Sequence, residues 1–366
     1  MTVGFYSPLP PARTGVADYA AALLAELRRR GPVEIAPARC DVALYHLGNN
    51  TQHAAIYRQS IERPGVVVMH DAVLNHFYLG QLDEAAYTEE FVYNYGEWNR
   101  ALGRELWRGR AAAGTDARYF DFPMLRRAAE RALAVVVHNP AAAETVRRHA
   151  PAARIVEIPH LFVPPEMPSP ADAQRFRAQL GVPPETFLFG ILGYLRETKR
   201  LLQVLDAFAG VTREVPQAML LVAGEFVSTD LERAAAPQLV EPYVRRLPYL
   251  PEADFWLAAS ALDACLNLRY PSAGETSGIT TRLMGIGKPV LVTDSAEYDR
   301  VPEGSVVRIA PGLGERQSLS AHIVLLTSRS DVARAVGLLG AAHVRACQGL
   351  DVAGSLYWNL LCECCA

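Results

Sequence analysis

The fold of this chain is decided by residues 65–71, GVVVMHD. The apolar residues of this stretch run without interruption, as they do in a strand buried on both faces of a parallel sheet. Segments that favour helices separate it from similar apolar runs, which lie at residues 3–6, 42–45, 134–137, 187–192, 218–223, 264–268 and 289–293. This alternation predicts an α/β protein built from doubly wound, Rossmann-like parallel sheets.

A proline-rich stretch divides the chain into two parts. The 366 residues are enough for two domains of ordinary size, and residues 163–170, VPPEMPSP, form a stiff joint of the kind found between domains. We therefore expect one Rossmann-like domain at residues 1–163, a second at 164–349, and a C-terminal helix with a tail at 350–366. Two such sheets would face each other across a cleft, with ligands at the carboxyl ends of the strands.

Composition and charge exclude several classes of protein. The 36 basic and 39 acidic residues give a net charge of −3, which leaves no basic surface for nucleic acid. No apolar run approaches the roughly 20 residues that a membrane helix needs, and the N-terminus, MTVGF, lacks the features of a secretory signal. The six cysteines show no disulfide pattern, and Cys362, Cys364 and Cys365 lack a fourth metal ligand. We expect a cytoplasmic protein that acts on small molecules, and peripheral membrane contact stays open.

The first candidate binding loop precedes the first helix, at residues 11–19. Thr14 is suited to cap that helix, and Gly15 lets a ligand approach the backbone closely. Free N–H groups at a helix start attract phosphate. The loop lacks the three spaced glycines of a dinucleotide site, so an ordinary capped turn is the alternative interpretation.

The second candidate is His70, which stands at the carboxyl end of the strand 66–69. Its neighbour Asp71 would fix the tautomer or charge of the imidazole. A structural histidine and a functional one are equally compatible with this pattern.

The third candidate is the loop at residues 193–200, which follows the strand 187–192. Arg196 and Lys199 would meet a helix N-terminus there, an arrangement suited to a diphosphate. Lys199 stands out because only two of the 36 basic residues are lysines. A solvated, charged turn is the alternative.

The fourth candidate is the segment at residues 271–281, PSAGETSGITT. Glu275 would accept hydrogen bonds from sugar hydroxyls, and backbone N–H groups around Ser277, Gly278 and Ile279 would begin the next helix. A single carboxylate among small residues suits a neutral polyol, whereas a metal cage needs several carboxylates.

Taken in order, these segments resemble the retaining glycosyltransferases of family 4 (glycosyl transferases group 1), which have the two-domain GT-B fold. The similarity spans about residues 3–295, and its most specific parts are His70-Asp71 and residues 271–294. Further similar segments lie at residues 7–19, 137–139, 158–160, 192–199, 222–225 and 287–290. In this family the last helix commonly crosses back to the first domain, which the resemblance implies for residues 350–366.

The resemblance implies transfer of a hexosyl group from a UDP- or GDP-sugar to a hydroxyl acceptor, with retention at the anomeric carbon. The acceptor would be a glycan, a lipid-linked sugar or a small molecule, in glycan or cell-envelope polysaccharide biosynthesis, and neither cofactor nor metal is expected. By resemblance, the catalytic residues are His70, Lys199 and Glu275. The donor-binding residues are Thr14, Gly15, Gly193, Arg196, Glu225, Leu250, Ser277, Gly278 and Ile279, and the acceptor-side residues are Asp71 and Asn139.

Two positions depart from the family pattern. Tyr194 stands where the family usually has an arginine, and Leu283 stands near the position of a second glutamate that normally holds the ribose, with Arg282 as the nearest charged side chain. A nucleotide-sugar epimerase of the same fold and a non-catalytic nucleotide-sugar-binding protein are the alternative functions.

Overall fold

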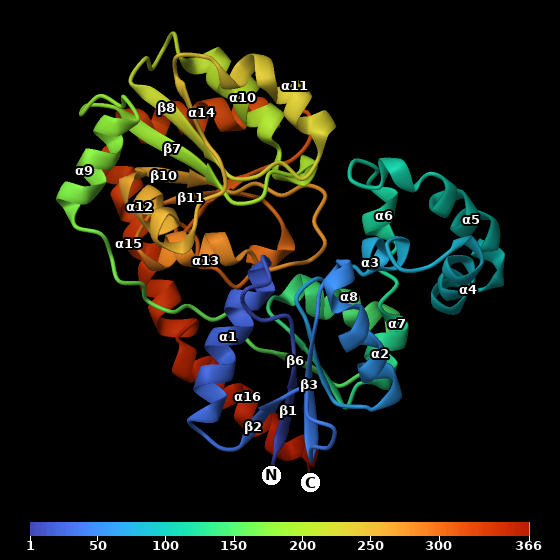
Figure 1. The fold of residues 1–366 in the computed structure, drawn as a ribbon. Helices are drawn as coiled ribbons and strands as arrows, with labels where there is room; N and C mark the ends of the chain where they lie inside the picture. Colours follow the sequence, from blue (N-terminus) through green and yellow to red (C-terminus); the bar gives the residue numbers. More distant parts are fainter. Residues whose placement is uncertain (366) are drawn as a thin grey trace. The chain divides into compact units, whose positions relative to one another are not determined.

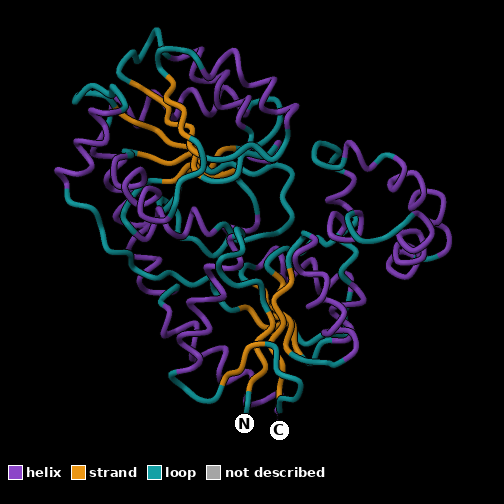
Figure 2. The backbone as a smooth tube through the Cα atoms, viewed as in Figure 1, coloured by secondary structure: helices purple, strands orange, loops and turns teal. Residues whose placement is uncertain are grey.

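The computed structural model describes residues 1–365, which form two compact units. Unit 1 contains Met1–Leu161, Pro271–Thr276 and the residues from Cys347 onward, and unit 2 contains Phe162–Tyr270 and Ser277–Ala346. Each unit is built around a six-stranded parallel sheet (Figure 1), whose strands are drawn in orange in Figure 2. The predicted α/β fold with two doubly wound sheets is therefore confirmed.

The expected ranges 1–163 and 164–349 place one division in the chain, whereas each unit contains segments from more than one part of the sequence. The short segment Pro271–Thr276, which carries Glu275, belongs to unit 1 although the residues on both sides of it belong to unit 2. Hydrogen bonds hold this segment in unit 1. The carbonyl oxygen of Ala273 accepts from the backbone N–H of Ala72, and that of Gly274 accepts from the side-chain amide of Asn139.

The sheet of unit 1 has the strand order β2-β1-β3-β4-β5-β6. Its strands are β1 (Val3–Tyr6), β2 (Val33–Ile35), β3 (Val42–Leu47), β4 (Val66–Met69), β5 (Ala134–Val137) and β6 (Ile155–Glu157). The strand order reverses between β1 and β3, so the loops that follow these two strands open at a switch point where ligands bind in such sheets. The strands β2 and β6 were not predicted, because three residues at a sheet edge leave no apolar run.

Side chains on the strands of unit 1 alternate between two apolar layers. In β4, for example, Val66 and Val68 pack in one layer, and Val67 and Met69 pack in the other. The first layer is covered by α1 (Gly15–Arg28) and α16 (Leu350–Cys365), and the second by α2 (Ala54–Glu62), α7 (Arg126–Arg131) and α8 (Pro140–His149). Burial on both faces explains why the strands read as continuous apolar runs.

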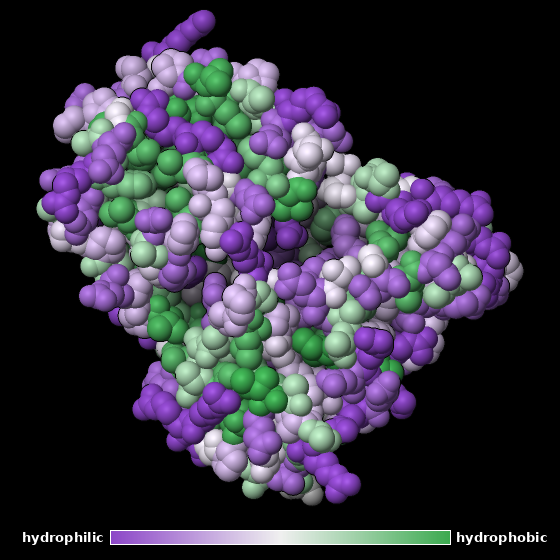
Figure 3. All heavy atoms as spheres, viewed as in Figure 1, coloured by the Kyte–Doolittle hydropathy of each residue, from purple (hydrophilic) through white to green (hydrophobic). Residues whose placement is uncertain are grey.

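Four further helices of unit 1 lie between β4 and β5 in the sequence. They are α3 (Asn75–Leu79), α4 (Glu84–Tyr95), α5 (Arg100–Arg108) and α6 (Arg118–Asp121), and Figure 1 shows them gathered beside the sheet. The helical stretch around residues 84–113 is not one continuous helix. It breaks at Gly96, whose φ of +85° is a conformation that residues with a side chain rarely adopt. The surface of this helical group is mainly hydrophilic in the view of Figure 3.

The last helix, α16, packs along α1 within unit 1. A Cβ at Gly31 would lie 2.3 Å from the Trp358 ring, and a Cβ at Gly354 would lie 2.4 Å from Glu26, so α16 closely approaches both α1 and the turn that follows it. The expected tail is absent from the described residues, because the helix continues to Cys365. Arg154 forms an ion pair with Glu363 near this end.

The sheet of unit 2 has the strand order β12-β11-β10-β7-β8-β9. Its strands are β7 (Phe187–Leu192), β8 (Ala218–Ala223), β9 (Val244–Leu247), β10 (Ala264–Leu266), β11 (Val290–Thr293) and β12 (Val307–Ile309). Counted from β7, this is the order 3-2-1-4-5-6 of the Rossmann fold, whose switch point lies between its first and fourth strands. Here those strands are β7 and β10.

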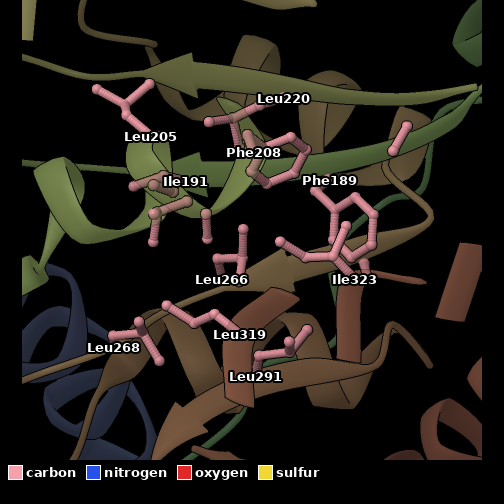
Figure 4. Packing of buried hydrophobic residues seen from close by; sticks show 14 of the residues in the cluster. Phe189, Ile191, Leu205, Phe208, Leu220, Leu266, Leu268, Leu291, Leu319 and Ile323 are labelled. Carbon is pink, nitrogen blue, oxygen red and sulfur yellow. The ribbon is translucent and has the colours of Figure 1, made fainter. Parts of the chain in front are cut away.

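Helices cover both faces of the unit 2 sheet. One layer, drawn in Figure 4, joins strand residues such as Phe189, Leu220 and Leu291 to Phe208 and Ile323. The helices of unit 2 are α9 (Pro170–Gln179), α10 (Leu201–Val211), α11 (Thr229–Leu239), α12 (Glu252–Ala261), α13 (Gly278–Gly285), α14 (Glu315–Ser328) and α15 (Ser330–Cys347). None of the helices within residues 1–365 is both long and apolar enough to cross a membrane.

Candidate active site

The loops that follow β7 and β8 approach each other closely in unit 2. Gly193 has a φ of +86° and Gly224 a φ of +153°. A Cβ at Gly224 would lie only 1.9 Å from the carbonyl oxygen of Gly193, so this approach requires glycine. The backbone N–H of Leu195 then donates to the carbonyl oxygen of Glu225 over 2.8 Å. Gly193 and Glu225, both assigned to donor binding, therefore lie side by side at the carboxyl edge of the sheet.

Lys199 is buried at this edge. It ends the short 3₁₀ helix η4 (Glu197–Lys199), its exposed fraction is 6%, and its Nζ donates to the carbonyl oxygen of Leu192 over 2.7 Å. A Cβ at Gly193 would lie 3.5 Å from the same Nζ. The positive charge of Lys199 is thus held beside Gly193, at the switch point of unit 2.

Two contacts hold the turn that carries Lys199. The next residue, Arg200, has a φ of +59° and forms a bidentate ion pair with the buried carboxylate of Glu315, with Nε–Oε distances of 3.0 and 3.1 Å. The backbone N–H of Tyr270 donates to the carbonyl oxygen of Thr198 over 2.8 Å. The second contact ties the loop after β10 to the loop after β7.

The start of α13 lies at the same place. Ser277 caps this helix, and its hydroxyl receives a hydrogen bond of 2.7 Å from Asn267. A Cβ at Gly193 would lie 2.7 Å from Cδ1 of Ile279, in the first turn of α13. The N–H groups that begin at Gly278 carry the positive end of the helix dipole. Lys199 and the helix start together form a site suited to a phosphate anion.

Leu283 and Arg282, which stand near the position of the family's second glutamate, both make other contacts in unit 2. Leu283 is fully buried in the core of unit 2, and Arg282 forms an ion pair with Glu252 and lies over the rings of Phe255 and Trp256. Arg282 is thereby engaged by α12, so this structure gives no support for it as the substitute for the second glutamate.

The other departure is Tyr194, which stands where the family usually has an arginine and lies near a second aromatic ring. The ring of Tyr194 has its centroid 6.3 Å from that of Tyr249. Arg196 is exposed, and Leu250 packs partly into the core after β9.

A row of histidines crosses the sheet of unit 1. The row consists of four histidines on or just after the neighbouring strands β3 to β6, namely His46, His70, His138 and His160. Each follows by two positions a residue that packs in the apolar layer facing α1. Ring centroids of neighbours in this row lie 5.2 to 5.6 Å apart. His46, His138 and His160 are not among the expected site residues, although their two-residue spacing from Leu44, Val136 and Ile158 is a signal present in the sequence.

These imidazoles are neutral at pH 7. Burial lowers the pKa of His138 to about 4 and that of His160 to about 3, and burial together with the neighbouring histidines lowers the pKa of His46 and His70 well below 6.5. Nδ1 of His138 donates to the carbonyl oxygen of Ile158 over 2.9 Å, which fixes its tautomer.

The hydrogen-bond partner of the His70 ring is His46, whereas Asp71 was the residue expected to fix the tautomer or charge of this imidazole. Nε2 of His70 lies 2.9 Å from Nδ1 of His46. The Asp71 carboxylate instead receives the backbone N–H of Asn49 over 2.7 Å. Because β3 and β4 are neighbours, residues at equivalent ends of the two strands meet more readily than residues adjacent in sequence, whose side chains point to opposite faces.

The segment with Glu275 lies beside this row in unit 1. The N–H of Ala72 donates to the carbonyl oxygen of Ala273 over 2.8 Å, and the Asn139 amide donates to Gly274 and Thr276 over 2.8 and 3.0 Å. The Glu275 carboxylate receives the N–H of Ala273 over 2.8 Å. Asn139, expected on the acceptor side, therefore holds the segment that carries Glu275.

The N-terminus of α1 is also in unit 1. Thr14 caps the helix by accepting the N–H of Ala17 over 3.0 Å. At Gly15 a Cβ would meet no heavy atom of residues 1–365 within 4 Å, so packing within the chain does not require glycine there. Both observations fit a helix start that a ligand can approach closely.

The expected site residues therefore fall into two groups, one in each unit. Unit 1 carries Thr14, Gly15, His70, Asp71, Asn139 and Glu275, and unit 2 carries Gly193, Arg196, Lys199, Glu225, Leu250, Ser277, Gly278 and Ile279. Within residues 1–365, no group of three or more histidine, cysteine, aspartate or glutamate side chains is arranged to hold a metal ion.

Comparison with known proteins identifies the fold. No protein-family model matches this sequence, and no curated protein does. Among solved structures, HepE from Anabaena in complex with UDP and glucose is similar over 99% of this chain and 100% of its own, with 16% identity and a TM-score of 0.71. Sucrose-phosphate synthase from Thermosynechococcus elongatus is 17% identical over 99% and 100% of the two chains, with a TM-score of 0.68.

A third structure agrees with these two. WaaG, a glycosyltransferase involved in lipopolysaccharide biosynthesis, is 15% identical over 98% of this chain and 99% of its own, with a TM-score of 0.65. The protein has the GT-B fold, with two Rossmann-like domains.

Proposed function

We propose that this protein is a retaining glycosyltransferase of family 4 that transfers a hexosyl group from a UDP- or GDP-sugar to a hydroxyl acceptor. The observation that carries the proposal is the position of Lys199, whose buried Nζ lies beside Gly193 at the switch point of unit 2, next to the start of α13. The proposal is also supported by proteins with the same fold, one of which was crystallised with UDP and with UDP-glucose.

The proposed reaction breaks the bond between the anomeric carbon and the β-phosphate oxygen of the donor. Negative charge grows on that phosphate, and fixed cations and N–H groups aimed at it lower the barrier most effectively. Lys199 and the first turn of α13 would supply this stabilisation, with Arg196 and the start of α1 at Gly15 as further contacts. The proposal requires no metal ion and no cofactor.

Retention would follow from attack on the same face of the sugar. The acceptor oxygen bonds to the anomeric carbon, and its proton passes to the departing phosphate. Glu275 would accept hydrogen bonds from the hexose hydroxyls, and neutral His70 would orient the sugar. In this proposal Glu225, Leu250, Ser277 and Ile279 line the donor site, and Asp71 lies on the acceptor side.

The acceptor would be a hydroxyl of a glycan, a lipid-linked sugar or a small molecule. We place the reaction in glycan or cell-envelope polysaccharide biosynthesis in the cytoplasm. Structures with a similar fold include both a sucrose-phosphate synthase and a glycosyltransferase involved in lipopolysaccharide biosynthesis.

Incubation with UDP-glucose, UDP-galactose and GDP-mannose tests the proposal. Release of UDP or GDP by the 366-residue protein, lowered by about 100-fold in Lys199→Ala, is the expected result, and NMR of the product's anomeric proton reports retention. An isomerised donor without nucleotide release would indicate an epimerase. Binding without turnover would indicate a sugar-nucleotide-binding protein, and absence of binding would overturn the proposal.

A further inference from the structure

Tyr19 stands at the centre of the histidine row in unit 1. Its ring centroid lies 4.9 Å from that of His70, at an interplanar angle of 79°, and 4.8 and 5.2 Å from those of His160 and His138. The side chain projects from α1, five residues beyond the cap at Thr14. Tyr19 therefore packs its ring against the edge or face of three imidazoles at once.

The hydroxyl of Tyr19 bonds to a residue from the other end of the chain. Its oxygen lies 2.9 Å from the hydroxyl oxygen of Tyr357 on α16, and both side chains are buried. Buried hydroxyls need a partner, because leaving one unpaired costs the free energy of its lost hydration. The pair therefore favours one orientation of the Tyr19 ring.

The position of Tyr357 is itself well defined. The close approaches at Gly31 and Gly354 seat α16 on α1. Arg30 adds to the seating, because it donates both to Glu26 over 2.8 Å and to the carbonyl oxygen of Asp351 over 3.0 Å. Close packing of this kind leaves Tyr357 little room to move.

We propose that Tyr19 and Tyr357 are positioning residues for His70, so that the C-terminal helix completes the sugar-binding side of the site. His46 holds one edge of the His70 imidazole by a hydrogen bond, and Tyr19 packs against it from α1. Tyr357 acts through Tyr19. The proposal rests on the proposed function only for the statement that His70 contacts the sugar.

The first experiment measures the geometry of His70 without any substrate. Histidine-selective ¹⁵N labelling of the full chain and long-range ¹H–¹⁵N correlation report the tautomer and environment of each imidazole, and His70→Gln assigns its signal. We expect Tyr357→Phe to shift or broaden the His70 signals. The control is Tyr87→Phe, which removes another buried hydroxyl of unit 1, bonded to Asn75 over 2.9 Å. It should leave His70 unchanged.

The second experiment measures catalysis with UDP-glucose. We expect Tyr357→Phe to lower kcat by about tenfold, because a small displacement of an orienting group is costly. The Kd for UDP should stay within about twofold of the wild-type value, since Lys199 and the first turn of α13, the main phosphate contacts of the proposal, lie in unit 2. Tyr19→Phe should act alike, and the double variant should lose little more than either single one, because the two hydroxyls form one interaction.

The outcomes separate the two proposals. If the wild-type protein neither binds nor uses sugar nucleotides, the proposed function fails, while the His70 signals still decide the positioning role. If Tyr357→Phe leaves the His70 signals unchanged in folded protein, or changes them no more than Tyr87→Phe does, the positioning role is overturned whatever the activity.

Discussion

Nζ of Lys199 lies 2.7 Å from the carbonyl oxygen of Leu192, the last residue of β7. The only other lysine, Lys288, also donates to main-chain oxygens, those of Ser260 and Leu262 at the end of α12. The two lysines therefore have the same kind of partner in different places. Lys199 lies at the switch point of the unit 2 sheet, whereas Lys288 caps a helix.

This difference predicts opposite effects of removing the two lysines. Lys199→Ala should lower the turnover of a sugar nucleotide by about 100-fold, by analogy with loss of one donor to a developing anion. Lys288→Ala should lower the free energy of unfolding by about 1–3 kcal/mol, because two carbonyls lose their donor, and should leave kcat near the wild-type value. Steady-state kinetics and urea unfolding of both variants make the comparison. Equal kcat values would remove Lys199 from the mechanism.

The pair of Arg200 and Glu315 should control the turn that carries Lys199. Glu315 is buried, so Glu315→Ala leaves the Arg200 charge without its partner and should cost about 3 kcal/mol of unfolding free energy. The same variant should lower kcat, because the turn loses its anchor.

The exposed pair of Arg233 and Asp230 provides the control for that experiment. Asp230→Ala should change the free energy of unfolding by less than about 0.5 kcal/mol. Urea unfolding and kinetics would contradict the prediction if the Glu315 and Asp230 variants behaved alike.

Glu275 should matter for both hydrolysis and transfer. Glu275→Ala removes the proposed contact with the hexose, so both rates should fall together. Asn139→Ala should act more weakly, since it releases the segment at Gly274 and Thr276 and costs about 1 kcal/mol of helix capping. Initial rates with and without acceptor measure both effects. Unchanged kinetics of Glu275→Ala would show that the sugar is held elsewhere.

The buried histidines predict that stability falls in acid. The pKa of His138 is lowered to about 4 and that of His160 to about 3, against 6.5 for the ordinary side chain. The unfolded chain therefore binds more protons than the folded protein between these values and pH 6.5. The contribution of these two histidines to the free energy of unfolding is therefore fully present above about pH 6.5. It is lost as the pH falls below that value, by up to about 1.4 kcal/mol per pH unit for each histidine.

Urea unfolding at several pH values between about 7.5 and 5 measures this slope. His138→Gln removes one of the titrating groups, so the free energy of unfolding should depend less steeply on pH in that variant. An unchanged slope would show that His138 does not contribute to the acid sensitivity.

Strong local patterns were predictable from sequence. Residues 187–192 and 218–223 were expected as strands and form β7 and β8 with these bounds, because a continuous apolar run of this length is typical of a strand buried on both faces of a parallel sheet. Shorter elements were not predictable. The three residues of β2 carry no periodicity, and the break at Gly96 depends on a positive φ that the pattern of apolar residues does not report.

The candidate site was predictable in part, for the same reason. His70, Lys199 and Glu275 follow recognisable strands, so their places at strand ends could be expected. Their partners could not. The bond from His70 to His46 and the segment held by Asn139 join residues 24 and 135 positions apart.

The order of apolar runs along the chain was thus sufficient to specify two parallel sheets and the loops that carry polar groups. The reason is that a strand buried on both faces needs apolar side chains at consecutive positions. Only the tertiary structure shows that Glu275 belongs to unit 1, that Leu283 is a core residue of unit 2, and that Tyr357 bonds to Tyr19, 338 positions away in the sequence. These depend on contacts between distant segments, and no local periodicity encodes such contacts.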